Sequence, residues 1–251
     1  MSTSLRRTEE TTDADRAEER SSRALAVMQP AIGVVMLDTR FPRLPGDIGN
    51  PATFPFPVRY VVVSGASPSR VVIDADRSLL QPFVVAAQAL EDDGCAAIST
   101  SCGFLALFQS ELQAAVTVPV WTSSLLLLPE LQAALPAGRR VGVVTADAAS
   151  LTWAHLRAAS ADEDTPVEGL SPDSAFHATL IDNRPELDAG LAEAATVAAA
   201  LRLVNRHPEL GAIVLECTNM PPYAEAVRAA TGLPVHDITT LIASRLPTLS
   251  R

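Results

Sequence analysis

Two cysteines occupy matching positions in this sequence. Cys102 follows the apolar run 96–100, and Cys217 follows the apolar run 212–216. Each cysteine precedes a segment with helical periodicity, and in both cases a proline between two aliphatic residues lies 17 positions after the cysteine. A cysteine on a turn from strand to helix lies near unpaired backbone N–H groups, which favour the thiolate and can hold anions. The pattern therefore predicts thiolate chemistry at two related sites.

Small polar residues adjoin both cysteines. Ser101 and Gly103 flank the first, and Thr218 and Asn219 follow the second, so both turns can offer hydrogen-bond donors to a small polar ligand. The third cysteine, Cys95, is interpreted as a buried apolar residue at the start of a strand. The four histidines show no pair at metal-ligand spacing and the sequence has no CxxC motif, so we expect no metal site.

The elements that must position the cysteines follow an α/β pattern. Short aliphatic runs alternate with longer Ala- and Leu-rich segments, as in parallel sheets connected by helices. Strands are predicted at 31–37, 58–64, 96–100, 118–121, 140–145, 167–170, 212–216 and 233–236. Helices are predicted at 77–92, 104–115, 123–135, 150–159, 185–205, 222–230 and 238–246, with Pro185 opening the fifth.

The two halves of the chain are related by an internal repeat. Besides the shared spacing after the cysteines, each half begins with a similar strand, Ile-Gly-Val-Val at 32–35 and Val-Gly-Val-Val at 141–144. We therefore predict two pseudo-symmetric lobes, each a small parallel sheet flanked by helices. Ligands of such sheets bind at the carboxyl ends of the strands, so the active site is expected in the cleft between the lobes, with one cysteine on each side.

Composition narrows the classes of function. All 19 basic residues are arginine, so a lysine Schiff base with pyridoxal phosphate and a P-loop lysine are both excluded. A net charge of −10 argues against a nucleic-acid partner. No apolar run is long enough to cross a membrane, and the polar segment 1–26 lacks the features of a secretory signal, so we expect a disordered tail on a soluble, cytoplasmic protein.

The residues around both cysteines resemble the aspartate/glutamate/hydantoin racemase superfamily, which is independent of cofactors and carries one cysteine in each lobe. The resemblance lies in Thr-Ser-Cys-Gly-Phe at 100–104, in Leu-Glu-Cys-Thr-Asn-Met-Pro-Pro-Tyr at 215–223 and in the long loop 38–51, and it covers nearly the whole chain after the tail. It implies that the last helix returns to the first lobe. The expected domains are then 27–122 plus 237–251 for lobe one and 123–236 for lobe two.

The resemblance implies an isomerase, a racemase or epimerase that inverts the α-carbon of an amino acid or a related carboxylate by two-base proton transfer. One cysteine would remove the proton and the other would deliver one to the opposite face, without cofactor or metal. Relatives place substrate-binding groups on the long loop. The expected substrate-binding residues are Thr39, Arg40, Asn50, Ser101, Gly103, Thr145, Thr218 and Asn219.

Departures from the racemase pattern leave the substrate open. Gly103, Phe104 and Asn219 replace the residues that glutamate and aspartate racemases generally carry, and Phe104 would make the pocket more apolar. A maleate-isomerase-like enzyme, an arylmalonate-decarboxylase-like enzyme and a catalytically silent amino-acid-binding protein are alternatives. The expected partner is a small carboxylate or amino-acid-like molecule, and a homodimer is left open.

Overall fold

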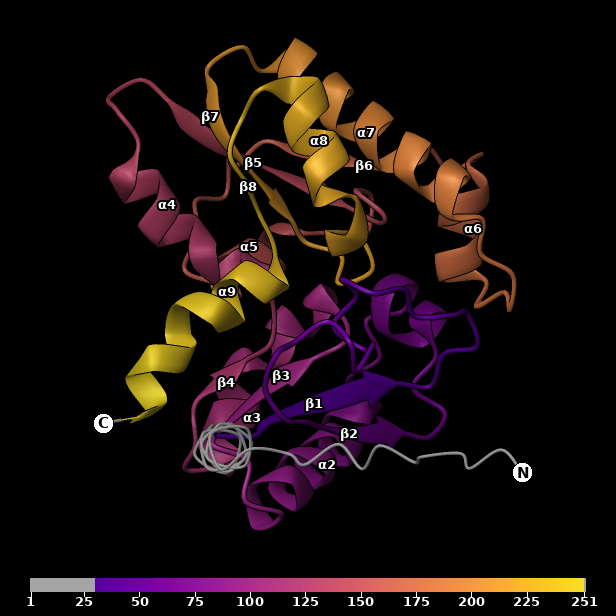
Figure 1. The fold of residues 1–251 in the computed structure, drawn as a ribbon, viewed down its shortest axis with the longest axis vertical. Helices are drawn as coiled ribbons and strands as arrows, with labels where there is room; N and C mark the ends of the chain where they lie inside the picture. Colours follow the sequence, from indigo (N-terminus) through magenta and orange to yellow (C-terminus); the bar gives the residue numbers. More distant parts are fainter. Residues whose placement is uncertain (1–29, 251) are drawn as a thin grey trace, which may run out of the picture.

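The computed structural model describes residues 30–250 of the chain. Eight strands form two four-stranded sheets in which every neighbouring pair is parallel. Figure 1 shows one sheet with its helices in the lower half of the molecule and the other in the upper half. The predicted α/β fold with two similar lobes is confirmed. The predicted tail at 1–26 lies outside the described residues.

The first sheet has the strand order β2-β1-β3-β4. The inner strands β1 and β3 are buried along their whole length, as expected for a parallel sheet covered on both faces, whereas the edge strand β2 is partly exposed. The strands are β1 (Ile32–Leu37), β2 (Val58–Val63), β3 (Ala97–Thr100) and β4 (Val120–Trp121). The connecting helices are a π-helical turn η1 (Ser69–Ile73), the 3₁₀ turn η2 (Arg77–Leu79), α2 (Leu80–Asp92), the 3₁₀ helix η3 (Gly103–Phe108) and α3 (Gln109–Ala115).

The second sheet repeats this order as β6-β5-β7-β8. Its strands are β5 (Arg140–Thr145), β6 (Val167–Gly169), β7 (Leu210–Leu215) and β8 (Val235–His236). Its helices are η4 (Ser124–Leu127), α4 (Leu128–Ala134), α5 (Trp153–Ala158), α6 (Ala175–Ile181), α7 (Ala189–Arg206), η5 (Pro221–Tyr223) and α8 (Ala224–Thr231). The last two helical segments are α9 (Ile238–Arg245) and η6 (Leu246–Ser250).

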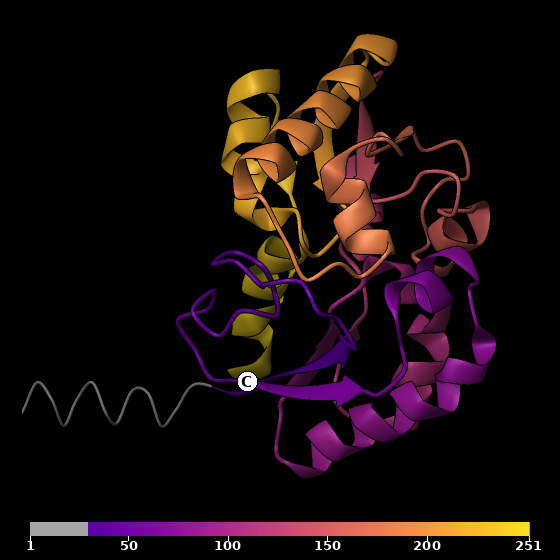
Figure 2. The same cartoon turned by 90° about the vertical axis from the view of Figure 1, so that its right-hand side faces the viewer.

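The helix α9 connects the two lobes. It leaves the second sheet after β8 and runs down to the first lobe (Figure 2). Its buried face, formed by Ile238, Leu241 and Ile242, packs against Ile32 and Trp121. The other face of the first sheet carries α2, and one continuous apolar cluster extends from there into the second lobe. The exact division of the chain into lobes stays a prediction.

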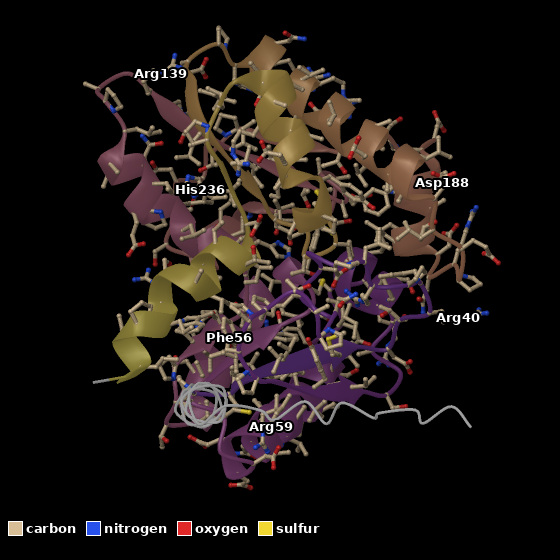
Figure 3. The ribbon with its side chains drawn as sticks, viewed as in Figure 1. Arg40, Phe56, Arg59, Arg139, Asp188 and His236 are labelled. Carbon is tan, nitrogen blue, oxygen red and sulfur yellow. The ribbon has the colours of Figure 1, made fainter. Side chains whose placement is uncertain are left out.

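Two helical predictions were wrong in detail. The helix expected to open at Pro185 begins at Ala189, because the side chain of Asp188 accepts a hydrogen bond from the backbone N–H of Leu191 and caps the first turn. Asp188 lies at this end of α7 in Figure 3. The short helix α6, capped by Ser174, was not predicted. All eight predicted strands are present, with ends that differ by at most two residues.

Within the described residues, we find no helix that combines the length and the apolar character needed to cross a membrane.

Candidate active site

A single cavity receives both cysteines. Cys102 directly precedes η3 and lies two positions after β3, and Cys217 lies two positions after β7. Because both strands are parallel to their neighbours, their carboxyl ends meet at the edges of the two sheets that face each other. The cavity spans about 390 Å³, including its open mouth. It is lined by Leu37, Thr39, Phe41, Arg43, Pro68, Val72, Ser101, Cys102, Gly103, Phe104, Ala146, Leu180, Ile181, Glu216, Cys217, Thr218 and Asn219.

The two cysteine turns are bound to each other. The hydroxyl of Thr218 donates a 2.6 Å hydrogen bond to the carbonyl oxygen of Ser101. The Ser101 hydroxyl in turn accepts from the backbone N–H of Leu37 at the end of β1. All these groups are buried, so their hydrogen bonds hold the turns at a fixed separation. The side chains of Ser101 and Thr218, which we expected to bind substrate, are therefore engaged in positioning the turns.

Burial keeps both cysteines in the thiol form. It raises the pKa of Cys102 to about 12, and the neighbouring carboxyl of Glu216 adds to the rise, while the backbone N–H groups of Phe104 and Leu105 and the charge of Arg43 oppose it. Burial, again with Glu216, also raises the pKa of Cys217 well above its ordinary value. A positive charge that enters the cavity with a ligand would favour the thiolate at either position.

Glu216 is a site residue that the sequence analysis missed. Its side chain is fully buried, and its Oε2 accepts a 2.7 Å hydrogen bond from the hydroxyl of Thr145. Burial raises the pKa of Glu216 to about 7, against the opposing effect of that hydrogen bond. Thr145, an expected substrate-binding residue, is not part of the cavity lining and instead supports this carboxyl. The sequence signal that could have identified Glu216 as a site residue is its acidic side chain at the end of an apolar strand.

Removing the charge of Glu216 is expected to change the pH dependence of stability. The raised pKa means that the folded protein retains a proton that the unfolded chain releases near 4.5. The stabilisation of the folded protein by this retained proton is complete below pH 4.5 and is lost as the pH rises through 7. The free energy of unfolding should therefore fall between pH 5 and 9 by up to about 3 kcal/mol in the wild type relative to Glu216→Gln.

Urea unfolding at several pH values measures this difference. Glu193→Gln, which alters an exposed glutamate on α7, serves as the matched control and should follow the wild-type curve. Parallel stability curves for Glu216→Gln and the wild type would show that the carboxyl at position 216 does not change its ionisation in this range.

Arg43 is the second residue that the sequence analysis missed. Its guanidinium lines the cavity, is 11% exposed and binds Asp47 at 3.1 Å and the hydroxyl of Thr39 at 2.9 Å. Asp47 also accepts a hydrogen bond from the amide of Asn219. The thiol of Cys217 donates to the carbonyl oxygen of that same amide at 3.6 Å. The long loop after β1 is thereby connected to the second cysteine turn.

Two expected loop residues lie elsewhere. Arg40 is exposed at the outer edge of the molecule (Figure 3), where its backbone N–H donates to Asn183. Asn50 uses its side chain inside the loop, donating to the carbonyl oxygen of Arg43 and accepting from the N–H of Ala52. Neither residue lines the cavity. Arg43, three positions after Arg40, supplies the cation instead, because its ion pair with buried Asp47 turns it inward.

No group of three or more His, Cys, Asp or Glu side chains that could hold a metal ion occurs among residues 30–250. The three cysteines are free thiols. The acid–base groups that line the cavity are thus Cys102, Cys217 and Glu216, with Arg43 as the cation.

Solved structures with the same fold include two kinds of enzyme. Unliganded arylmalonate decarboxylase superposes with a TM-score of 0.55 and 20% sequence identity, covering 88% of this chain and 92% of that chain. A glutamate racemase from Bacillus anthracis gives a TM-score of 0.55 at 17% identity, covering 88% of this chain and 82% of that chain. The predicted fold of the Asp/Glu racemase superfamily is confirmed. A scan against protein-family models finds no match.

Curated relatives point to a different reaction. The chain is 33% identical over 220 residues to a dimethylsulfoniopropionate lyase of Durusdinium sp. clade D, covering 84% of this chain and 72% of that protein. It is 31% identical over 239 residues to dimethylsulfoniopropionate lyase 6 of Emiliania huxleyi (strain CCMP1516), covering 91% of this chain and 62% of that protein. The chain thus spans less than two thirds of the latter protein's length.

These relatives overturn the predicted activity. An isomerase of the racemase type was expected from the two cysteines, but the curated relatives are lyases, and racemases resemble this chain only in fold. The prediction was wrong because a pair of thiols beside a carboxylate site supports proton removal in more than one reaction class. By its sequence over more than four fifths of its length, the chain belongs to the family of the dimethylsulfoniopropionate lyases.

Proposed function

We propose that this protein is a lyase that cleaves dimethylsulfoniopropionate into dimethyl sulfide and acrylate. The observation that carries the proposal is the 33% identity to the Durusdinium lyase. The cavity lined by both cysteines supports it, because an elimination beside a carboxylate requires a base.

The reaction needs only one base. A thiolate of the Cys102–Cys217 pair removes a proton from the carbon next to the carboxylate. The electrons of that C–H bond form the carbon–carbon double bond of acrylate, and the bond between C3 and sulfur breaks. Its electron pair leaves with the sulfur, so dimethyl sulfide departs as a neutral molecule and requires no proton. The second cysteine remains a thiol.

The substrate itself supplies the charge that a thiolate requires. Burial holds both thiols protonated. The sulfonium group brings a positive charge into this poorly solvated space, and a nearby cation favours the ionised thiol. Phe41, Phe104 and Leu180 give the lining an apolar and partly aromatic surface suited to the methyl groups of the sulfonium. Reactive thiolate is then formed mainly when substrate is bound, and the thiol proton is released to solvent.

Arg43 provides the countercharge for the substrate carboxylate. Its guanidinium faces the cavity, and its buried Nε–H has no partner among the described residues. The ion pair with Asp47 fixes the direction of the group without filling all of its donors.

Replacing Arg43 by lysine should lower kcat/KM for dimethylsulfoniopropionate by roughly 10- to 100-fold, the range of a lost hydrogen bond to a charged group. Lysine keeps the charge but cannot reproduce the planar contacts to Asp47 and Thr39. Arg40→Lys, on the exposed part of the same loop, is the control and should keep wild-type kinetics. Equal kinetic constants for the two variants would contradict the assignment of Arg43.

Incubation of the purified protein with dimethylsulfoniopropionate tests the function. Gas chromatography should detect dimethyl sulfide in the headspace, and proton NMR should detect an equal amount of acrylate. The matched control substrate is 3-(methylthio)propionate, whose neutral sulfur would have to leave as a thiolate and which should remain intact. Absence of dimethyl sulfide across pH 6 to 9 would rule out the proposed activity.

We also propose a reducing compartment, the cytosol, as the site of action. Three free cysteines, two of them at the reacting centre, support this, because an oxidising compartment would modify reactive thiols. The proposed partner is the small zwitterionic substrate alone.

A further inference from the structure

Glu216, a residue of the cavity wall, has an unused hydrogen-bonding atom. Its side chain is completely buried, and the residue belongs to the cavity lining between the two cysteine turns. Oε2 is bound by the hydroxyl of Thr145, but Oε1 has no hydrogen-bond partner among residues 30–250. A buried polar atom without a partner is costly, so such an atom in a cavity indicates a contact that a ligand completes.

The surroundings of Glu216 favour the neutral carboxylic acid. Its only bonded protein partner in the described structure is a hydroxyl that donates to Oε2, and no salt bridge to a cation compensates a charge. The guanidinium of Arg43 is already paired with Asp47. A buried, unpaired carboxylate beside two thiols would be unfavourable, and it would also oppose formation of a thiolate. In the neutral form the proton belongs on Oε1, because Oε2 already accepts the hydrogen bond from Thr145.

Gly103 brings this oxygen close to the first cysteine turn. A Cβ atom at position 103 would lie 2.2 Å from Oε1 and 2.5 Å from the carbonyl oxygen of Glu216. Only glycine allows the carboxyl to pack against the beginning of η3, next to Cys102. The acid from the second lobe therefore contacts the turn that carries the cysteine of the first lobe.

We propose that Glu216 is a catalytic residue whose Oε1–H donates a hydrogen bond to the carboxylate of the substrate. The inference rests on the proposed function, because it assigns the contact to dimethylsulfoniopropionate. Removal of the proton from C2 moves negative charge toward the carboxylate oxygens in the transition state. A donor that is already in place within a poorly solvated cavity stabilises that charge, and a carboxylic acid kept neutral near pH 7 can be such a donor.

Three other charged or titratable groups line the cavity with Glu216, and a fourth, Asp47, is ion-paired with one of them. Cys102 lies on the turn after β3 and Cys217 on the turn of Glu216 itself, while Arg43 and Asp47 extend from the long loop. Burial raises the pKa of both thiols, to about 12 for Cys102, and the guanidinium of Arg43 is held in an ion pair with Asp47. Glu216, whose pKa burial raises to about 7, changes charge between pH 5.5 and 8.5.

Two half-substrates distinguish a donor to the carboxylate from a charged partner for the sulfonium. Propionate represents the carboxylate end, and trimethylsulfonium represents the cationic end. Their dissociation constants can be measured by isothermal titration calorimetry between pH 5.5 and 8.5, with the wild type, Glu216→Gln and Thr145→Val. Thermal unfolding of each variant at pH 6 establishes that it is folded.

The proposal predicts that propionate binds the wild type more weakly as the pH rises, by up to about tenfold for each pH unit above the pKa of Glu216. In Glu216→Gln the affinity should be independent of pH, because the amide donates without titrating. In Thr145→Val the midpoint of the change should move to higher pH, because the lost hydroxyl no longer stabilises the carboxylate. A purely structural role of Glu216 would not produce these pH profiles.

Two results would overturn the proposal. One is propionate binding to the wild type that is undetectable or independent of pH. The other is trimethylsulfonium binding that strengthens with pH in the wild type and not in Glu216→Gln, which would make Glu216 a carboxylate partner of the cation. Failure of the lyase activity is a separate outcome, because release of dimethyl sulfide is measured with the whole substrate and propionate binding is measured without it.

Discussion

Serine at position 102 or 217 is expected to lower kcat/KM for release of dimethyl sulfide by roughly 10²- to 10⁴-fold, the usual contribution of a general base. Serine preserves the size of the side chain, but its hydroxyl is a much weaker acid than a thiol and supplies almost no anion near neutral pH. The variant with the larger loss identifies the sulfur that removes the proton. The smaller loss, in the other variant, measures how much the cysteine that does not act as the base contributes to the geometry and charge of the cavity.

The chain contains its own control for this experiment. Cys95 is also buried but packs in the core of the first lobe, outside the cavity lining. Cys95→Ser should therefore retain wild-type kinetics, with a modest loss of thermal stability from placing a hydroxyl in an apolar environment. Initial rates from headspace gas chromatography measure all three variants. A Cys102→Ser, Cys217→Ser double variant with more than a tenth of the wild-type rate would exclude the cysteine pair as the source of the base.

A single methyl group at position 103 is expected to disrupt the same site. In Gly103→Ala the new Cβ would collide with both the carboxyl and the backbone of Glu216, and the backbone atom cannot move aside without shifting the second cysteine turn. Such overpacking costs about 1–3 kcal/mol of stability. Displacement of the reacting groups by about 1 Å should lower kcat by roughly 100-fold.

Gly190→Ala is the matched control for this substitution. Position 190 lies in the first turn of α7, where the nearest atom to a new Cβ would be an oxygen of Asp188 at 3.4 Å. Alanine should therefore leave activity unchanged and raise stability by up to about 1 kcal/mol. Circular dichroism melting curves and initial rates compare the two variants. Wild-type activity and melting temperature in Gly103→Ala would contradict the close packing of Glu216 against the first turn.

Much of the fold could be predicted because its inner strands are buried on both faces. The run 32–37 is almost wholly apolar, and 140–145 has a buried Val-Gly-Val-Val core, because burial between two layers of helices requires that composition. Helix ends were less predictable, because a local side-chain contact decides them. Asp188 rather than Pro185 sets the beginning of α7, since its carboxylate reaches the N–H of Leu191. The short helix α6 depends on packing of Phe176 and Leu180 that the local sequence does not reveal.

The reaction class was not predictable from the site residues. Removal of a proton next to a carboxylate is the first step of a racemisation and of an elimination alike, so the same thiols serve both. The two outcomes differ in whether the neighbouring carbon carries a group that can leave, and this is a property of the substrate. The similarity to the lyases over more than four fifths of the chain distinguishes elimination from racemisation. The cysteine motif does not.

The sequence by itself determined that two cysteines end matching strands, because a repeated unit places equivalent residues at equivalent sheet edges. Which other side chains enter the cavity was decided by tertiary structure. Arg40 and Arg43 occupy the same irregular loop, and only the ion pair with buried Asp47 directs Arg43 inward. Glu216 becomes an unpaired buried acid only when the two lobes close around it against Gly103. Side-chain direction and burial arise from contacts between segments far apart in the chain, which local sequence patterns do not encode.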